Sequence, residues 1–175
     1  TPTFYNVCES NFKCIEEIRH RMSTWYRKVC KDLGNLPECI DYFEDEYLNA
    51  KQELTLRGKS LERHGSELPG IVEHRYGQLQ ELEAILEHLN IEMRKKKTAV
   101  FRKYLEHYNK ALSSRDADKF AEGDVEVVDM ALLVNEFSLV RNKFLGILKG
   151  IDQKGWMIGH ITKLRAAGLD DAAVD

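Results

Sequence analysis

Apolar residues recur at alternating intervals of three and four positions along most of the chain. This spacing is typical of helices that pack lengthwise against one another. Four stretches carry it: Ile15, Ile18, Met22, Trp25 and Val29; Ile40, Phe43, Tyr47, Ala50 and Leu54; Leu79, Leu82, Leu86, Leu89 and Met93, then Val100; and Met130, Leu133, Phe137, Val140, Phe144, Ile147 and Ile151. No comparable stretch alternates with the period of two expected of a half-buried strand. The chain is therefore predicted to be all-α, a helical bundle with coiled-coil-like seams.

Residues that interrupt or start helices divide these stretches. Gly34 to Pro37 form a first break, Gly65 to Gly70 a second, and Ser113 to Asp124 a longer third one that ends in a suitable N-cap residue. We therefore expect the following division of the chain: an N-terminal extension of two helices over residues 1–66, a long helix over 67–113, a loop over 114–126, a C-terminal helical region over 127–168 and an acidic tail over 169–175.

The third stretch predicts an unusually long helix. It runs from near Pro69 to Leu112, and about 40 residues at a rise of 1.5 Å each would reach roughly 60 Å. The first two helices can fold back on this rod as an intramolecular bundle.

The C-terminal helix has an apolar face that is wider than one partner helix needs. Beyond its seam it carries Leu132, Val134, Leu139, Leu145 and Leu148, which favours self-association into a homo-oligomer. The predicted self-association residues are Leu133, Phe137, Val140, Phe144, Ile147, Ile151, Trp156, Ile161 and Leu164. The alternative is a tightly folded monomer with this helix at its core.

Composition argues against several functional classes. The chain has 43% hydrophobic and 31% charged residues, and no apolar run approaches the roughly 20 residues of a membrane span. Its four cysteines, Cys8, Cys14, Cys30 and Cys39, lack the spacing of a zinc site. No convincing nucleophile, base and orienting group stand together, and no metal or cofactor signature is present. We expect a cytoplasmic protein that is not an enzyme and needs no cofactor.

One segment concentrates positive charge although the net charge of the chain is −3. Arg94, Lys95, Lys96 and Lys97 are consecutive, and Arg102 and Lys103 follow one heptad after Lys95 and Lys96. At 100° per residue the four consecutive cations cover about 300° of a helix. The heptad puts Lys96 and Lys103 at seam positions, and the acids near in sequence are few, namely Glu92 and Glu106. A bound polyanion would relieve their mutual repulsion.

Aromatic residues are interleaved with these cations. Phe101, Tyr104 and Tyr108 lie in or just after the basic run. Cations that follow a phosphate backbone, together with aromatic faces for stacking, are typical of proteins that bind single-stranded nucleic acid without reading its sequence. The predicted binding residues are Arg94, Lys95, Lys96, Lys97, Arg102, Lys103, Tyr104 and Tyr108. The alternative is a solvated basic face whose aromatics belong to the core.

The same region and the C-terminus together resemble the UvsY-type recombination mediators of tailed phages. The resemblance is carried by VFRKYLEHYNK at 100–110, by the long apolar helix after it, and by LKGIDQKGWMIGHITKLRAAG at 148–168. It covers roughly residues 70–168. Tyr104 replaces a basic residue of the family motif, and His107 replaces its first tyrosine.

The resemblance implies a non-enzymatic homo-oligomer that acts in phage DNA recombination and repair. Such a protein binds single-stranded DNA and contacts both a RecA-type recombinase and the phage single-strand-binding protein. It helps the recombinase to load onto the covered DNA, in the cytoplasm of an infected bacterial host. The alternative function is a structural or adaptor protein, such as a virion or assembly component, in which the seams hold a partner helix and the basic run is only surface.

Overall fold

The computed structural model describes residues 24–107 and 113–169, and its elements are helices. In chain order they are α2 (Thr24–Lys31), a short 3-10 helix η1 (Leu33–Asn35), α3 (Leu36–Glu53), α4 (Leu61–His107), α5 (Ser114–Glu122) and α6 (Val125–Ala166). Over the described residues no strand is present, so the all-α prediction is confirmed.

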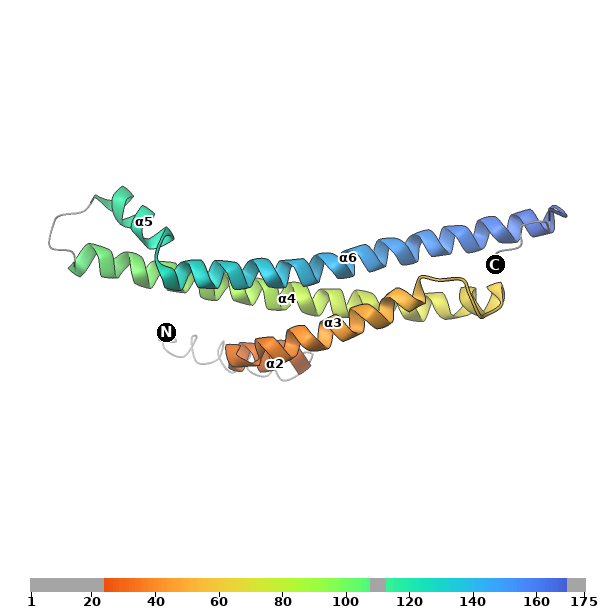
Figure 1. Cartoon of the computed structure of the whole chain (residues 1–175), viewed down its shortest axis with the longest axis horizontal. Helices are drawn as coiled ribbons and strands as arrows, with labels where there is room; N and C mark the ends of the chain where they lie inside the picture. The colour runs from red at the N-terminus through yellow and green to blue at the C-terminus, as the bar shows by residue number, and fades with distance from the viewer. Residues whose placement is uncertain (1–23, 108–112, 170–175) are drawn as a thin grey trace, which may run out of the picture.

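The two longest helices form the spine of the molecule. α4 and α6 run antiparallel, side by side, while α2 and α3 lie along one flank and α5 sits at the end where α4 leads into α6 (Figure 1). The 47 residues of α4 correspond to a rod of about 70 Å. The result is an elongated bundle rather than a compact one.

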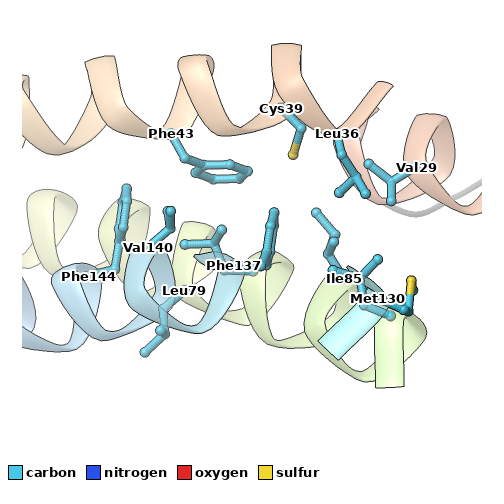
Figure 2. Packing of buried hydrophobic residues seen from close by; sticks show 12 residues of the cluster. Val29, Leu36, Cys39, Phe43, Leu79, Ile85, Met130, Phe137, Val140 and Phe144 are labelled. Carbon is cyan, nitrogen blue, oxygen red and sulfur yellow. The ribbon is translucent and has the colours of Figure 1, made fainter. Parts of the chain in front are cut away.

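The main core forms where α2 and α3 cover the α4–α6 pair. Phe43 of α3 and Phe144 of α6 meet edge to face, with ring centroids 5.8 Å apart. Figure 2 shows side chains of α2 and α3 directed toward those of α4 and α6 in this layer. The other members of the buried cluster are Val29, Leu36, Cys39, Leu79, Leu82, Ile85, Leu89, Met130, Phe137 and Val140. Over the described residues the predicted seams therefore pack against one another within one chain, while Ile15, Ile18 and Met22 of the first seam lie outside the described residues.

The predicted break at residues 65–70 is wrong, because α4 begins at Leu61 and contains Pro69. A proline inside a helix removes one hydrogen bond and crowds the carbonyl four residues earlier. Here that residue is Gly65, and both Gly65 and Pro69 face solvent, where water can satisfy the carbonyl. The true break is the loop between α3 and α4, where Gly58 has a positive φ of 80°. The predicted boundary between residues 66 and 67 therefore falls inside a helix.

The predicted loop over 114–126 is also wrong over most of its length. Ser113 caps α5 by accepting a hydrogen bond from the Asp116 amide, and Ala117 and Ala121 of α5 are buried. The helix is only nine residues long, too short to show the periodicity from which the longer helices were predicted. The predicted N-cap at Asp124 is confirmed, since its carboxylate accepts from the Glu126 amide at 3.1 Å.

A buried ionic network joins α3 to α4. Arg75, only 3% exposed, donates to both carboxylate oxygens of Glu53 at 2.7 and 2.9 Å, and to Glu46 at 2.6 Å. Gln78 adds a hydrogen bond to Glu46 at 2.7 Å. Partial burial by itself would raise the pKa of Glu46, but the hydrogen bonds from Gln78 and Arg75 outweigh it and hold that pKa below its ordinary value. Each member of the network has a partner, as buried charge requires.

A second buried cation fixes the end of α3 against α6. Lys154 is 5% exposed, and its Nζ donates to the backbone carbonyl of Glu53 at 2.6 Å. Burial lowers the pKa of Lys154. The last carbonyls of a helix lack partners within the helix and carry partial negative charge. Lys154 therefore caps α3 from another helix.

Candidate nucleic-acid interface

The basic run lies on the last four turns or so of α4, and its side chains reach solvent. Arg94 and Lys95 are each 67% exposed, Lys96 46% and Lys97 36%. The buried residue of this part of α4 is Val100, which packs with Ala121 and Val127. The prediction that Lys96 and Lys103 occupy seam positions is wrong, because both are exposed and the contact with α5 and α6 runs through Val100.

Three of the predicted cations share one open face of α4, which we call the basic face. Arg94, Lys95 and Arg102 line a shallow groove of about 440 Å³ together with Ile91, Thr98 and Ala99. These positions recur at helical spacing, so the groove follows the helix axis. A row of cations along a rod can neutralise successive phosphates of a nucleic-acid strand.

The pairing of this face is weak. Arg94 contacts Glu87 at 3.0 Å and Lys95 contacts Glu92 at 2.6 Å, all on the solvated surface of α4. Exposed pairs of this kind contribute little and exchange readily. Within the part of the chain that the structure describes, Arg102 and Lys103 make no ion pair. These four cations are therefore accessible to an external anion.

The other two cations face acids from distant parts of the chain. Lys97 lies 3.1 Å from Asp118 and 2.9 Å from Glu122, both on α5, and Lys96 lies 3.5 Å from Glu126 on α6. Hydrogen bonds to Glu122 and Asp118 raise the pKa of Lys97. Sequence reasoning counted only acids near the run in the sequence and missed these three. Their signal was present in 113–126, which holds five acidic residues against two basic ones.

The structure does not present Tyr104 as a free stacking surface. Its hydroxyl is 3.1 Å from Asp124 Oδ2, and its ring lies against Phe120 with centroids 5.7 Å apart. Phe101 is partly buried against the same small cluster. Tyr104 therefore helps to dock α5, and the predicted stacking role is wrong for this conformation. Tyr108 lies outside the described residues.

The residues predicted for self-association divide into two groups. Five of them are buried inside the chain, each at most 4% exposed: Phe137, Val140, Phe144, Ile147 and Ile151. They cannot contact a second copy while the bundle is intact, so this part of the prediction is corrected in favour of the tightly folded alternative. Leu133, Ile161 and Leu164 are partly exposed, and Trp156 is 77% exposed.

An exposed apolar stripe runs along the N-terminal half of α6. Val125, Val128, Leu132 and Leu139 are 40–72% exposed and recur at helical spacing. The predicted wide apolar face is therefore partly real, because Leu132 and Leu139 belong to this stripe. Val134, Leu145 and Leu148 instead pack against the main core.

A groove of about 630 Å³ lies at the other end of the molecule, between the start of α4 and the end of α6. Trp156, His160 and Lys163 line it from α6, and Leu68 and Val72 from α4. Gly155 widens it, since an added Cβ there would come within 3.2 Å of Leu68. This groove combines an exposed aromatic ring with an apolar floor.

Cys39 does not offer a reactive thiol. Cys39 is completely buried in the main core, and burial raises the pKa of its thiol to about 12. Cys30 is half-buried, while Cys8 and Cys14 lie outside the described residues. Within residues 24–107 and 113–169, no three His, Cys, Asp or Glu side chains gather as a metal site would require. No described helix has the length and apolar content to cross a membrane.

Comparison with known proteins gives no further guide to function. No family model, curated protein or solved structure matches the chain.

Proposed function

We propose that the chain binds single-stranded DNA through the basic face of α4. The observation that carries this proposal is the row formed by Arg94, Lys95 and Arg102 along an open groove, with Lys103 beside it and without strong internal pairing. Such a row neutralises phosphates and leaves the bases unread, which gives binding without sequence specificity.

The resemblance to the UvsY-type mediators supplies the proposed biological role. In that role the protein is a non-enzymatic recombination mediator that binds DNA and helps a RecA-type recombinase to replace the phage single-strand-binding protein. Contacts that are mostly exposed ion pairs form and break quickly, which suits a protein that must hand its strand to a partner. The recombinase, the single-strand-binding protein, the phage-infected host and the homo-oligomeric assembly belong to this proposal.

Fluorescence anisotropy of a labelled single-stranded oligonucleotide tests the binding site. The double variant Lys95→Glu, Arg102→Glu should bind at least tenfold more weakly at low salt, because it reverses two charges one heptad apart on the basic face. The matched control is Lys149→Glu, Arg165→Glu, which makes the same charge change at two exposed positions of α6. Equal loss in both variants would mean that only net charge matters, and no loss in either would remove the basic face from the site.

A second candidate function is an adaptor that holds a partner protein. It is favoured by the groove around Trp156 and by the exposed stripe of α6, since aromatic residues in apolar grooves are common anchors of protein interfaces. Absence of oligonucleotide binding by the wild-type protein at low salt would favour this second function over the first.

A further inference from the structure

The acidic side of α5 covers part of the basic run. Asp118 and Glu122 lie one turn apart on α5 and both contact the Nζ of Lys97. Their carboxylates therefore occupy the position that a phosphate would take beside this cation. Glu126, at the start of α6, stands in the same relation to Lys96.

The side chains that α5 buries against the rest of the bundle are small. Its buried side chains are two alanines, Ala117 and Ala121, and Phe120 is 46% exposed even though it touches Tyr104. Alanine side chains bury little apolar area, so they contribute little to docking. The ion pairs of Lys97 are exposed and are weakened further by salt.

α5 also depends on that attachment for its own helicity. Isolated helices of fewer than about 12–15 residues are marginal in water, and α5 has nine. Segments with few buried apolar contacts open locally more often than the core does. By contrast, the basic run itself lies on a 47-residue helix, α4, that the main core anchors. α5 can therefore leave while α4 stays in place.

We propose that α5 is an intramolecular cover that mimics a polyanion and is displaced when a nucleic-acid strand binds α4, exposing Lys97 as an additional phosphate contact. This inference rests on the proposed function and adds a regulation of the same site. The covered state presents the row of Arg94, Lys95, Arg102 and Lys103, and the open state extends it to Lys97. Because a strand must compete with Asp118 and Glu122 for Lys97, the cover lowers the affinity of the resting protein.

The variant Asp118→Asn, Glu122→Gln tests the competition. It removes the two carboxylates and keeps side chains of the same size. Removing the competing carboxylates raises the affinity for a single strand about fivefold at low salt, because exposed ion pairs no longer have to be broken. The dependence of log K on log salt keeps about the same slope, because the bound strand contacts Lys97 in both proteins. The matched control is Asp129→Asn, Glu136→Gln, which makes the same change in net charge at exposed positions of α6. We expect the control to change affinity less than twofold, and circular dichroism should show equal helicity in all three proteins.

Hydrogen exchange of the wild-type protein tests the displacement itself. With saturating single-stranded oligonucleotide, the amides of 114–122 should exchange faster than in the free protein, while those of 91–103 do not. Slower or unchanged exchange in α5 while the oligonucleotide is bound would overturn the proposal, as would equal affinity gains in the variant and its control. If the wild-type protein and both variants fail to bind at low salt, the proposed function fails first, and the exchange experiment has no bound state to compare.

Discussion

Two charged regions of α4 use similar residues in opposite ways. Around Arg75 the charges are buried, and bidentate contacts and a glutamine amide hold them in one arrangement. On the basic face around Arg94 the charges are exposed, and each meets at most one loosely held acid of its own helix. The first arrangement fixes how α3 sits on α4, and the second leaves cations accessible. Burial, rather than residue type, separates a structural charge from an accessible one.

The largest expected effect is the loss of folding stability in Arg75→Met. Removing this guanidinium leaves Glu46 and Glu53 without their main partner, and breaking a buried ion pair in this way costs about 3 kcal/mol. The matched change Arg94→Met, on the exposed part of the same helix, should alter the free energy of unfolding by less than ~0.5 kcal/mol. Urea unfolding followed by circular dichroism measures both. Equal effects would erase the distinction between the two regions.

A smaller change in the free energy of unfolding is expected when the pH is lowered. The folded-state pKa of Glu46 lies below its ordinary value of 4.5. As the pH falls, Glu46 therefore takes up its proton at a higher pH in the unfolded chain than in the folded protein. The stabilisation by Glu46 is therefore complete above the ordinary value and is lost as the pH falls through the folded pKa. In Glu46→Gln the free energy of unfolding should fall less steeply between pH 5 and pH 3, a window of about two units around the ordinary carboxyl range. Asp45→Asn, at an exposed neighbouring position, should keep the wild-type slope.

The smallest expected effect is on the affinity for an oligonucleotide and concerns Tyr104. Tyr104→Leu removes the contacts of this side chain with Phe120 and Asp124, which help to dock α5. Under the proposed displacement of α5, the substitution should leave oligonucleotide binding unchanged or strengthen it. A stacked base would contribute about 1–3 kcal/mol, so its loss would reduce affinity by roughly five- to a hundredfold. Anisotropy titrations of the variant distinguish these outcomes. A loss of that size would restore the stacking role predicted from the sequence.

The repeated seams explain why the fold class followed from the sequence. In α6, positions from Met130 to Ile151 keep the three-four spacing without interruption, and nearly all of them are buried. The continuity of α4 through Pro69 could not be predicted in the same way. A proline is a reliable helix terminator only where its lost hydrogen bond matters, and at this solvated position the apolar contacts of Leu68, Ile71 and Val72 carry the helix across it.

The candidate site followed from the sequence only in part. The cluster of cations is a local feature, so its location on α4 was predictable from composition and spacing. The acids facing Lys96 and Lys97 come from residues about 20 to 30 positions away, and the packing of Tyr104 depends on a helix that showed no clear period. Both depend on how α5 folds back on α4, which a local pattern does not encode. The prediction of self-association had the same difficulty, since burial within the chain and burial between copies select the same apolar residues.

The salt dependence of single-strand binding tests the central claim most directly. If the four open cations Arg94, Lys95, Arg102 and Lys103 carry the interaction, and Lys97 joins them when α5 is displaced, the slope of log K against log salt should lie between about −3 and about −3.5, since each neutralised phosphate of a single strand contributes about −0.7. In Lys95→Glu, Arg102→Glu the slope should fall to about half that value or binding should vanish. A wild-type slope near zero, or the same steep slope in the variant, would contradict the assignment of the basic face as the binding site.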